Sequence, residues 1–232
     1  MASRARFIFP LALLILLPWA AAQSGRPIPR LKRTGNQYRF LVNGQPFLML
    51  GGQAHNSTAT AAQDLEPFWK SLVGIHANMA EVPLYWDLIE PQPGKYDFHL
   101  IDEIVAGARR NGLRLVFLWF GTWKNGDMDY TPEWLKRDHA TYKHVVGARG
   151  NELWIVSPLC EAARDADARA FRAVMEHIRS IDELDRTVIM VQDEGTFEDG
   201  RWVSARRLNG DELHVELPEQ SRILRVRLLR RL

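Results

Sequence analysis

The sequence predicts an α/β fold: a partial (β/α)8 (TIM) barrel of about the first four βα units, followed by a short C-terminal all-β segment. Two observations lead to this prediction. From Phe47 to Gln192, apolar runs typical of strands alternate with amphipathic helical patterns, as in a parallel sheet built from βα units. After Gln192 only short alternating runs separated by turn residues remain.

Residues 1–22 have the pattern of a signal peptide. Arg4 and Arg6 precede the apolar run Phe7–Ala20, and residues 20–22 supply the small side chains that signal peptidase requires. The run is shorter than the roughly 20 residues that cross a bilayer. We therefore expect a secreted protein, periplasmic or extracellular, with no membrane contact after signal removal; an uncleaved anchor is the alternative. Residues 23–37 are polar and contain prolines, which predicts a linker.

The composition indicates a globular protein and excludes several classes of partner. Hydrophobic residues make up 46% and charged residues 25% of the chain, unlike a largely disordered protein. A net charge of +2 gives no reason to expect nucleic acid or an acidic membrane surface as a partner. Cys160 is the one cysteine, so an intrachain disulfide is excluded. The oligomeric state is not indicated.

A β-hairpin is predicted before the βα units. Tyr38–Val42 and Phe47–Leu50 are apolar runs on either side of Asn43-Gly44, the dipeptide that favours a tight hairpin turn. We take Phe47–Leu50 as the first barrel strand, because it runs directly into Gly51 and Gly52, where the chain can turn sharply.

The following elements come from hydrophobic periodicity. Apolar residues at helical spacing predict three helices, and buried apolar runs predict three further strands, the run Leu113–Phe120 being nearly continuous, as in a sheet covered on both faces. The helices are Asp64–Val73, Leu100–Arg110 and Asp165–Ile181, and the strands are Asn78–Leu84, Leu113–Phe120 and Thr187–Val191. A long loop precedes the third helix.

The chain holds only about half of a barrel, since a complete one takes roughly 250 residues and eight strands. Residues 38–192 are predicted to form the partial barrel domain, and residues 193–232 the C-terminal β segment. Within that segment strands are expected at Arg201–Val203, Leu213–Leu217 and Ile223–Leu229.

Three segments resemble glycoside hydrolase family 35, in its bacterial β-galactosidase branch. They are Gly51–His55, then Val82–Phe98 with its W-x-x-x-E-P and G-x-Y-D-F motifs, and Leu118–Gly126. The similarity spans about Tyr38 to Gln192, and the segment from Phe197 resembles the β-domain end of the same branch. The resemblance implies retaining hydrolysis of terminal β-galactosides, a β-galactoside or related oligosaccharide as partner, and no metal or cofactor.

Sugar sites combine an aromatic surface with planar hydrogen-bonding groups, because sugars present apolar C–H faces and a ring of hydroxyls. Such residues follow the predicted strands, at the end where barrel enzymes keep their sites. Two alternatives stay open: Trp119 as plain core, and Glu90 as a residue that orders the loop before Pro91. The predicted substrate-binding residues are His55, Tyr85, Trp86, Glu90, Trp119, Trp123, Lys124 and Asn125.

The catalytic residues are incomplete. A retaining glycosidase needs two carboxyl groups about 5–5.5 Å apart. The resemblance implies an acid/base Glu in a Q-x-E-N-E run after strand four, but here the chain reads Gln192-Asp193-Glu194-Gly195-Thr196. Glu194 matches only the earlier Glu of that run, and nothing matches the nucleophile strand. We predict an internal deletion that joins strand four to the C-terminal segment, with Glu194 as the remaining catalytic candidate.

Three functions remain open at this point. The first is a β-galactosidase-type hydrolase, catalytically impaired, that relies on Glu194 or on a partner subunit. The second is an inactive sugar-binding remnant. The third is a non-functional product of a shortened gene, whose open barrel would expose strand edges and apolar surface.

Overall fold

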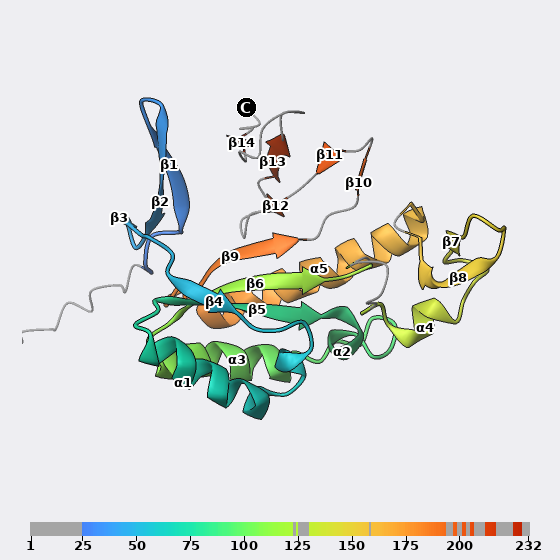
Figure 1. Cartoon of the computed structure of the whole chain (residues 1–232), viewed down its shortest axis with the longest axis horizontal. Coiled ribbons are helices and arrows are strands. Elements are labelled where there is room, and N and C mark those ends of the chain that lie inside the picture. Colours follow the sequence, from blue (N-terminus) through green and yellow to red (C-terminus); the bar gives the residue numbers. More distant parts are fainter. Residues whose placement is uncertain are drawn as a thin grey trace, which may run out of the picture.

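The computed structural model describes residues 25–122, 124, 130–157 and 159–193, and five short strands beyond them (Figure 1). The predicted signal peptide lies outside the described residues. Within the described part, no helix is both long enough and apolar enough to cross a bilayer.

A parallel sheet forms the centre of the molecule. Its strands are β4 (Gly51–Gln53), β5 (Met79–Tyr85), β6 (Arg114–Phe120) and β9 (Val188–Asp193), hydrogen-bonded in the order β4-β5-β6-β9. Each neighbouring pair is parallel. The predicted α/β fold with a parallel sheet is therefore confirmed, and the strands predicted around residues 78–84, 113–120 and 187–191 are present.

The first strand of the sheet lies later than predicted. Phe47–Leu50 is not a sheet strand, since only Gln45–Pro46 (β3) and Gly51–Gln53 are extended and paired there. The side chain of Asn78 instead bonds the backbone of this stretch, donating to Leu48 O at 2.8 Å and accepting from Leu50 N at 2.9 Å. The first paired residue of β4 is Gly51, opposite Met79, and only glycine fits there because a Cβ at this position would lie 2.1 Å from Met79 O.

The N-terminal hairpin is larger than predicted. The strand β1 (Arg30–Thr34) pairs antiparallel with β2 (Gln37–Val42), so the segment 23–37 is not a plain linker. No residue of β1 is buried, so this strand is held by its pairing with β2 rather than by burial. The turn between β2 and β3 is as predicted: Asn43 and Gly44 have φ of 52° and 77°, the left-handed values of a tight hairpin turn.

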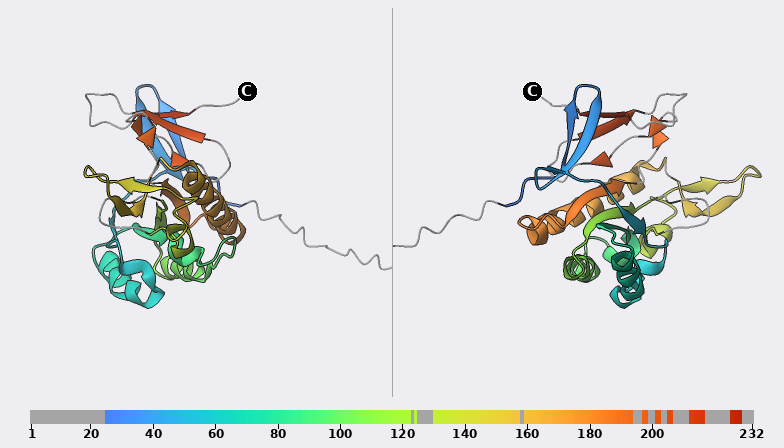
Figure 2. Two further views of the ribbon diagram at one scale, coloured as in Figure 1. Left: turned by 90° about the vertical axis from the view of Figure 1, so that its right-hand side faces the viewer. Right: turned by 60° about the vertical axis from the view of Figure 1, so that its left-hand side comes forward.

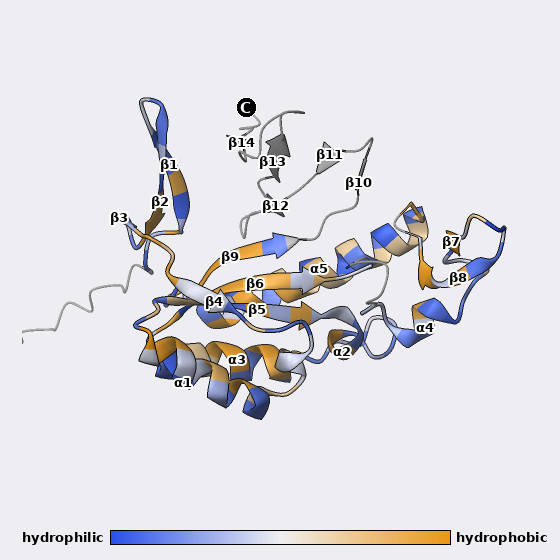
Figure 3. Cartoon of the chain, viewed as in Figure 1, coloured by the Kyte–Doolittle hydropathy of each residue, from blue (hydrophilic) through white to orange (hydrophobic). Residues whose placement is uncertain are grey.

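Three helices cover one face of the sheet: α1 (Glu66–Gly74), α3 (His99–Arg110) and α5 (Glu161–Asp182). They agree with the predicted helices, although α5 begins four residues before Asp165. Figures 1 and 2 show α1 and α3 together on the side of the sheet away from the hairpin, and Figure 3 shows hydrophobic residues along the strands and the facing helix sides. The helix residues that pack against the sheet include Trp69, Leu72, Ile101, Ile104, Phe171 and Val174.

The predicted long loop before α5 contains regular structure. A short helix, α4 (Glu133–Lys136), is followed by an antiparallel hairpin of β7 (His144–Val146) and β8 (Glu152–Val156). Another single-turn helix, α2 (Trp86–Ile89), follows β5 directly. The short 3-10 helices Thr58–Thr60 and Ala62–Leu65 lead from β4 into α1.

The amino end of β9 is held to α3 and α5 by a buried carboxylate. Asp182 accepts hydrogen bonds from the backbone N–H groups of Thr187 and Val188, at 3.0 and 2.7 Å. It also pairs with Arg109 at 2.6 Å, and Arg109 donates in turn to Thr187 Oγ1. Because these contacts join α3, α5 and the start of β9, they set the position of that strand.

Beyond Asp193 the residues that the structure describes lie in five short β-strands. They are β10 (Phe197–Glu198), β11 (Arg201–Trp202), β12 (Ala205–Arg206), β13 (Glu212–Glu216) and β14 (Arg225–Leu228). These strands pair antiparallel, β10 with β11, and β13 with both β12 and β14.

Candidate functional site

The segments that follow β5 and β6 meet at one edge of the sheet. Tyr85 and Phe120, the last residues of these strands, are paired in register. The chain after each strand therefore leaves the sheet at the same place, although the two segments are far apart in sequence. In open α/β sheets and in barrels, ligands bind at this carboxyl edge.

Glu90 holds the segment after β5. Its side chain is buried, and its two carboxylate oxygens accept hydrogen bonds from Trp86 Nε1 and Gly94 N, each at 2.7 Å. The indole N–H of Trp134 donates to the backbone oxygen of Glu90 at 3.0 Å, which ties α4 to the same loop. The structure thus bears out the alternative that Glu90 orders its loop; direct contact with a sugar stays a prediction.

Asp167 holds the segment after β6. Its Oδ1 accepts a hydrogen bond from Trp119 Nε1, and its Oδ2 accepts from the N–H and the hydroxyl of Thr122, all at 2.7 Å. Gly121 lies against this carboxylate, because a Cβ at that position would be 2.3 Å from Asp167 Oδ2. Asp167 therefore fixes the backbone that leads to residues 123–126.

The sequence analysis did not identify Asp167. A usable signal existed: Asp167 lies four residues after Ala163 and three before Ala170, both of which are buried on the sheet side of α5. An acidic residue beside the apolar face of a helix needs a specific partner.

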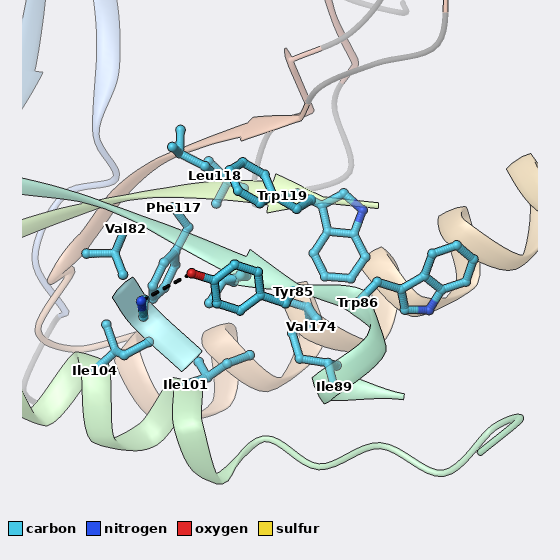
Figure 4. Packing of buried hydrophobic residues seen from close by; sticks show 14 of the residues in the cluster. Val82, Tyr85, Trp86, Ile89, Ile101, Ile104, Phe117, Leu118, Trp119 and Val174 are labelled. Carbon is cyan, nitrogen blue, oxygen red and sulfur yellow. Dashed lines mark hydrogen bonds between the residues drawn. The ribbon is translucent and has the colours of Figure 1, made fainter. Parts of the chain in front are cut away.

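Trp86 and Trp119 lie inside the core. Their side chains are 0% and 1% exposed, and Figure 4 shows them packed among neighbours such as Ile89 and Val174. Trp119 also meets Phe171 edge-on at 5.7 Å. The core alternative for Trp119 is therefore what the structure shows, and in this conformation neither indole offers a face to a sugar. Their role as a sugar platform stays a prediction.

Tyr85 is equally buried, with its hydroxyl accepting a hydrogen bond from Ala59 N at 3.2 Å. Its ring packs at 5.0 Å from that of Tyr130. Burial raises the pKa of the Tyr85 phenol, so the group is protonated at neutral pH. Tyr85 joins the 3-10 turn after β4 to the site edge.

Polar groups that solvent reaches are present at the same edge. His55 is exposed just after β4, and Lys124 is half-buried with its Nζ 4.4 Å from the centroid of the Phe120 ring. Asp87, also half-buried, lies in the first turn of α2 and accepts a hydrogen bond from Leu88 N. The predicted residues Trp123, Asn125 and Glu194 lie outside the described residues.

Glu81 is a second acidic group that the sequence analysis overlooked. It interrupts the apolar run of β5, is half-buried, and interacts with the charge of Lys124. Burial raises the pKa of the Glu81 carboxyl, and Lys124 offsets part of that rise. A charged residue within an otherwise buried strand was the signal in the sequence.

Two solved glycosidase structures align with part of this chain at low sequence identity. The β-galactosidase from the haloarchaeon Halorubrum lacusprofundi aligns at 18% identity with a TM-score of 0.49, covering 66% of this chain and 22% of that one. The catalytic domain of a β-amylase from Paenibacillus polymyxa aligns at 12% identity with a TM-score of 0.48, covering 62% and 36%.

Curated relatives are β-galactosidases. That of Xanthomonas manihotis is 31% identical over 113 residues, which is 46% of this chain and 18% of the relative. That of the dog, Canis lupus familiaris, is 33% identical over 108 residues, covering 42% and 15%. The chain thus spans less than a fifth of the length of these relatives.

Two family models match. A domain of unknown function (DUF5597) matches residues 170–217, across the boundary between the sheet and the C-terminal segment. The glycoside hydrolase family 42 model, described as β-galactosidase, matches residues 54–180, more than half of the chain. The matched range contains β5, β6 and both carboxylates, Glu90 and Asp167, that hold the site edge. The chain therefore belongs to the β-galactosidase family of glycoside hydrolases.

Proposed function

We propose that this chain is a glycoside hydrolase of the β-galactosidase type that recognises a terminal β-galactoside at the carboxyl edge of β5 and β6 and is catalytically impaired. One observation carries the proposal. The two segments that resemble β-galactosidases leave the sheet at the same edge, and each is held by a carboxylate: the buried Glu90 after β5 and the partly buried Asp167 after β6. Such support is what a preorganised binding edge requires.

The edge offers suitable partners for a sugar. Lys124 is a cationic donor that solvent reaches, and His55 offers a planar ring with polar nitrogens. In this proposal Trp123 supplies the stacking surface and Asn125 an amide, since both follow the backbone that Asp167 fixes. Trp86 and Trp119 then act by positioning this edge from the core.

The impairment is inferred from the chain after β9. Glu194 follows Asp193, but Thr196 stands where the resemblance implies an acid/base Glu. Two residues along an extended chain displace a side chain by about 6–7 Å, too far for Glu194 to take the same place.

Three finer points belong to the proposal. The motifs in Gly51–His55, Val82–Phe98 and Leu118–Gly126 support a family 35 grouping. The missing counterpart of the nucleophile strand supports an internal deletion, and the four predicted βα units support a partial TIM barrel.

Secretion belongs to the proposal as well. The basic and apolar pattern of residues 1–22 supports export to the periplasm or the medium, where polymeric and oligomeric galactosides are accessible.

Isothermal titration calorimetry with galactose tests the binding, with glucose as the control sugar. We expect saturable galactose binding that Lys124→Ala weakens by roughly tenfold or more, because a hydrogen bond to a charged group contributes about 1.5–3 kcal/mol. The matched control is Lys95→Ala, which removes an exposed lysine whose contact is the nearby side chain of Gln92. Absence of galactose binding, or equal loss in both variants, would contradict the proposal.

The inactive sugar-binding remnant remains the second candidate. It is favoured by the engagement of both Glu90 and Asp167 in loop contacts, since neither carboxylate is then placed for acid–base chemistry. Galactose binding without turnover is the result that this candidate requires.

A further inference from the structure

A cluster of two histidines and one glutamate lies where the β7–β8 hairpin meets the chain after α4. His139 Nδ1 is 2.6 Å from Glu152 Oε1, and His144 Nδ1 is 3.9 Å from the same oxygen. The two imidazole rings stack at 4.2 Å with an angle of 16° between them. In Figure 1 this hairpin and α4 lie beyond the carboxyl ends of β5 and β6.

The hydrogen-bond partners of His144 require a cation. His144 is buried, and its two ring nitrogens both face backbone oxygens: Nδ1 lies 2.9 Å from Leu153 O, and Nε2 lies 3.1 Å from Lys136 O. Carbonyl oxygens only accept, while a neutral imidazole carries a single N–H. One ring nitrogen of neutral His144 therefore faces an oxygen without a proton between them. Either a second proton or a metal ion must resolve this conflict.

We propose that His139, His144 and Glu152 bind a divalent transition-metal ion of the Zn²⁺ type. The three ligand atoms all lie within 4.8 Å of one another. Tetrahedral zinc with bonds of about 2.0–2.1 Å places its ligand atoms roughly 3.3 Å apart. The separations of 2.6 and 3.9 Å from Glu152 Oε1 lie on either side of that value, and the two histidine nitrogens lie within 4.8 Å of each other.

The surroundings of His144 fit a metal ligand. If Nδ1 binds the ion, Nε2 carries the proton and donates to Lys136 O, the arrangement that commonly orients a metal-bound histidine. Leu153 O, close to Nδ1, is placed to serve as a fourth ligand. The conflict between Nδ1 and this oxygen then disappears, because both face the same cation.

A metal ion would join all three side chains of the cluster at once. A second proton on His144 would satisfy only its own two contacts, and His139 Nδ1 would then keep its separate contact with Glu152 Oε1 at 2.6 Å. Imidazole and carboxylate together are a ligand set that suits Zn²⁺. The side chains of His139 and Glu152 are 56% and 49% exposed, so an ion can enter and the His139 ring can tilt toward it.

The ion would stabilise the β7–β8 hairpin against α4. Ligands come from the chain just after α4, from β7 and from β8, and Trp134 of α4 bonds to Glu90 O at the candidate sugar edge. The metal is thus structural rather than catalytic. The inference is independent of whether the sugar edge binds galactose.

Titration of the metal-free mature protein with Zn²⁺ alone, followed by calorimetry and thermal unfolding, tests the proposal. We expect one Zn²⁺ per chain and a higher melting temperature in its presence. His139→Asn and Glu152→Gln should each raise the Kd for Zn²⁺ by at least about tenfold. Both side chains are exposed, so we expect these substitutions to leave the fold intact. Uptake of the ion should release protons, because ligands must be deprotonated.

His99→Asn is the matched control. It removes another exposed histidine paired with a glutamate, His99 and Glu103 at 3.4 Å, which lacks a second histidine. Zn²⁺ affinity should be unchanged in this variant. Absence of saturable binding, an unchanged Zn²⁺ affinity in His139→Asn, or an equal loss of affinity in His99→Asn would overturn the proposal. So would nitrogen NMR spectra showing both His144 ring nitrogens protonated in protein saturated with Zn²⁺.

Discussion

The two faces of the parallel sheet differ sharply in what covers them. The helix-facing side is one continuous core that includes Leu115 and Phe117 of β6 and side chains from α1, α3 and α5. The opposite side has a small separate cluster of four buried residues, Val42, Met79, Val116 and Ile189, beneath the N-terminal hairpin. In a closed barrel, this second face is filled by side chains from the other strands.

Burial on both faces explains why β6 is a nearly continuous apolar run in the sequence. In β6 both faces are buried, one by the helices and the other at Val116 by the cluster that includes Val42 of the hairpin, so alternation is lost. Stability and the candidate function therefore depend on different parts of the molecule. The helix face holds the fold together, whereas the candidate sugar edge depends on Glu90, which holds the segment after β5, and on Asp167 of α5, which holds the segment after β6. Four predictions test this separation.

Truncation of adjacent residues in β6 should separate the two faces most clearly. Phe117→Ala, on the helix face, should lower the free energy of unfolding by about 3–5 kcal/mol, because it leaves a large cavity. Val116→Ala, on the hairpin face, should cost less than half of that. Urea denaturation of both variants measures the difference. Equal losses would mean that the hairpin face contributes as much as the helix face.

Removal of Asp182 should be the next largest effect. Asp182→Ala leaves the N–H groups of Thr187 and Val188 and the charge of Arg109 without their partner, which should cost roughly 3 kcal/mol. Asp185→Ala is the control, since this exposed carboxylate lies 3.5 Å from Arg109 and should contribute less than about 1 kcal/mol. Similar unfolding midpoints for the two variants would refute the structural role of Asp182.

Addition of a methyl group at Gly121 should disturb the site edge. Gly121→Ala places a Cβ against Asp167 Oδ2 and should destabilise the protein by about 1–3 kcal/mol. Gly74→Ala is the comparison, because no atom lies within 4 Å of a Cβ at that helical position. Galactose binding measured on both should fall only for Gly121→Ala. A Gly121→Ala protein with normal stability would show that the Asp167 contact is dispensable.

The smallest effect concerns pH. Burial raises the pKa of the Glu81 carboxyl above its ordinary value of 4.5, so this carboxyl binds a proton more readily in the folded than in the unfolded protein. Stability contributed by this group is present below pH 4.5 and is lost as pH rises through the folded pKa. Glu81→Gln should therefore be slightly more stable than wild type at pH 7 and equal to it at low pH. A destabilised variant at pH 7 would indicate that the Lys124 attraction outweighs burial.

The elements of the sheet core were predictable because their signals are local. The helical spacing of Ile101, Ile104 and Val105 predicts α3, and the apolar run at 113–120 predicts β6. The strand β4 was misplaced because its position depends on the close approach of Gly51 to Met79, a contact between distant residues. The strand β1 was missed because it has no buried face of its own.

The site was predictable only in part, for the same reason. Its location after β5 and β6 follows from the order of strands and from the family motifs. Its supports do not: Asp167 reaches Trp119 and Thr122 across more than 40 positions, and the His139, His144 and Glu152 cluster exists only once the hairpin has formed. Burial of Trp86 and Trp119 likewise depends on packing that motif spacing does not reveal.

Steady-state hydrolysis of 4-nitrophenyl β-D-galactoside by the mature protein tests the central claim most directly, with a Glu194→Gln variant measured beside it. An impaired hydrolase that relies on Glu194 should show slow but saturable turnover, and this turnover should disappear in Glu194→Gln. No rate above the buffer background for the wild-type protein, at concentrations where galactose binding is saturated, would contradict the proposed hydrolase and favour the inactive sugar-binding remnant.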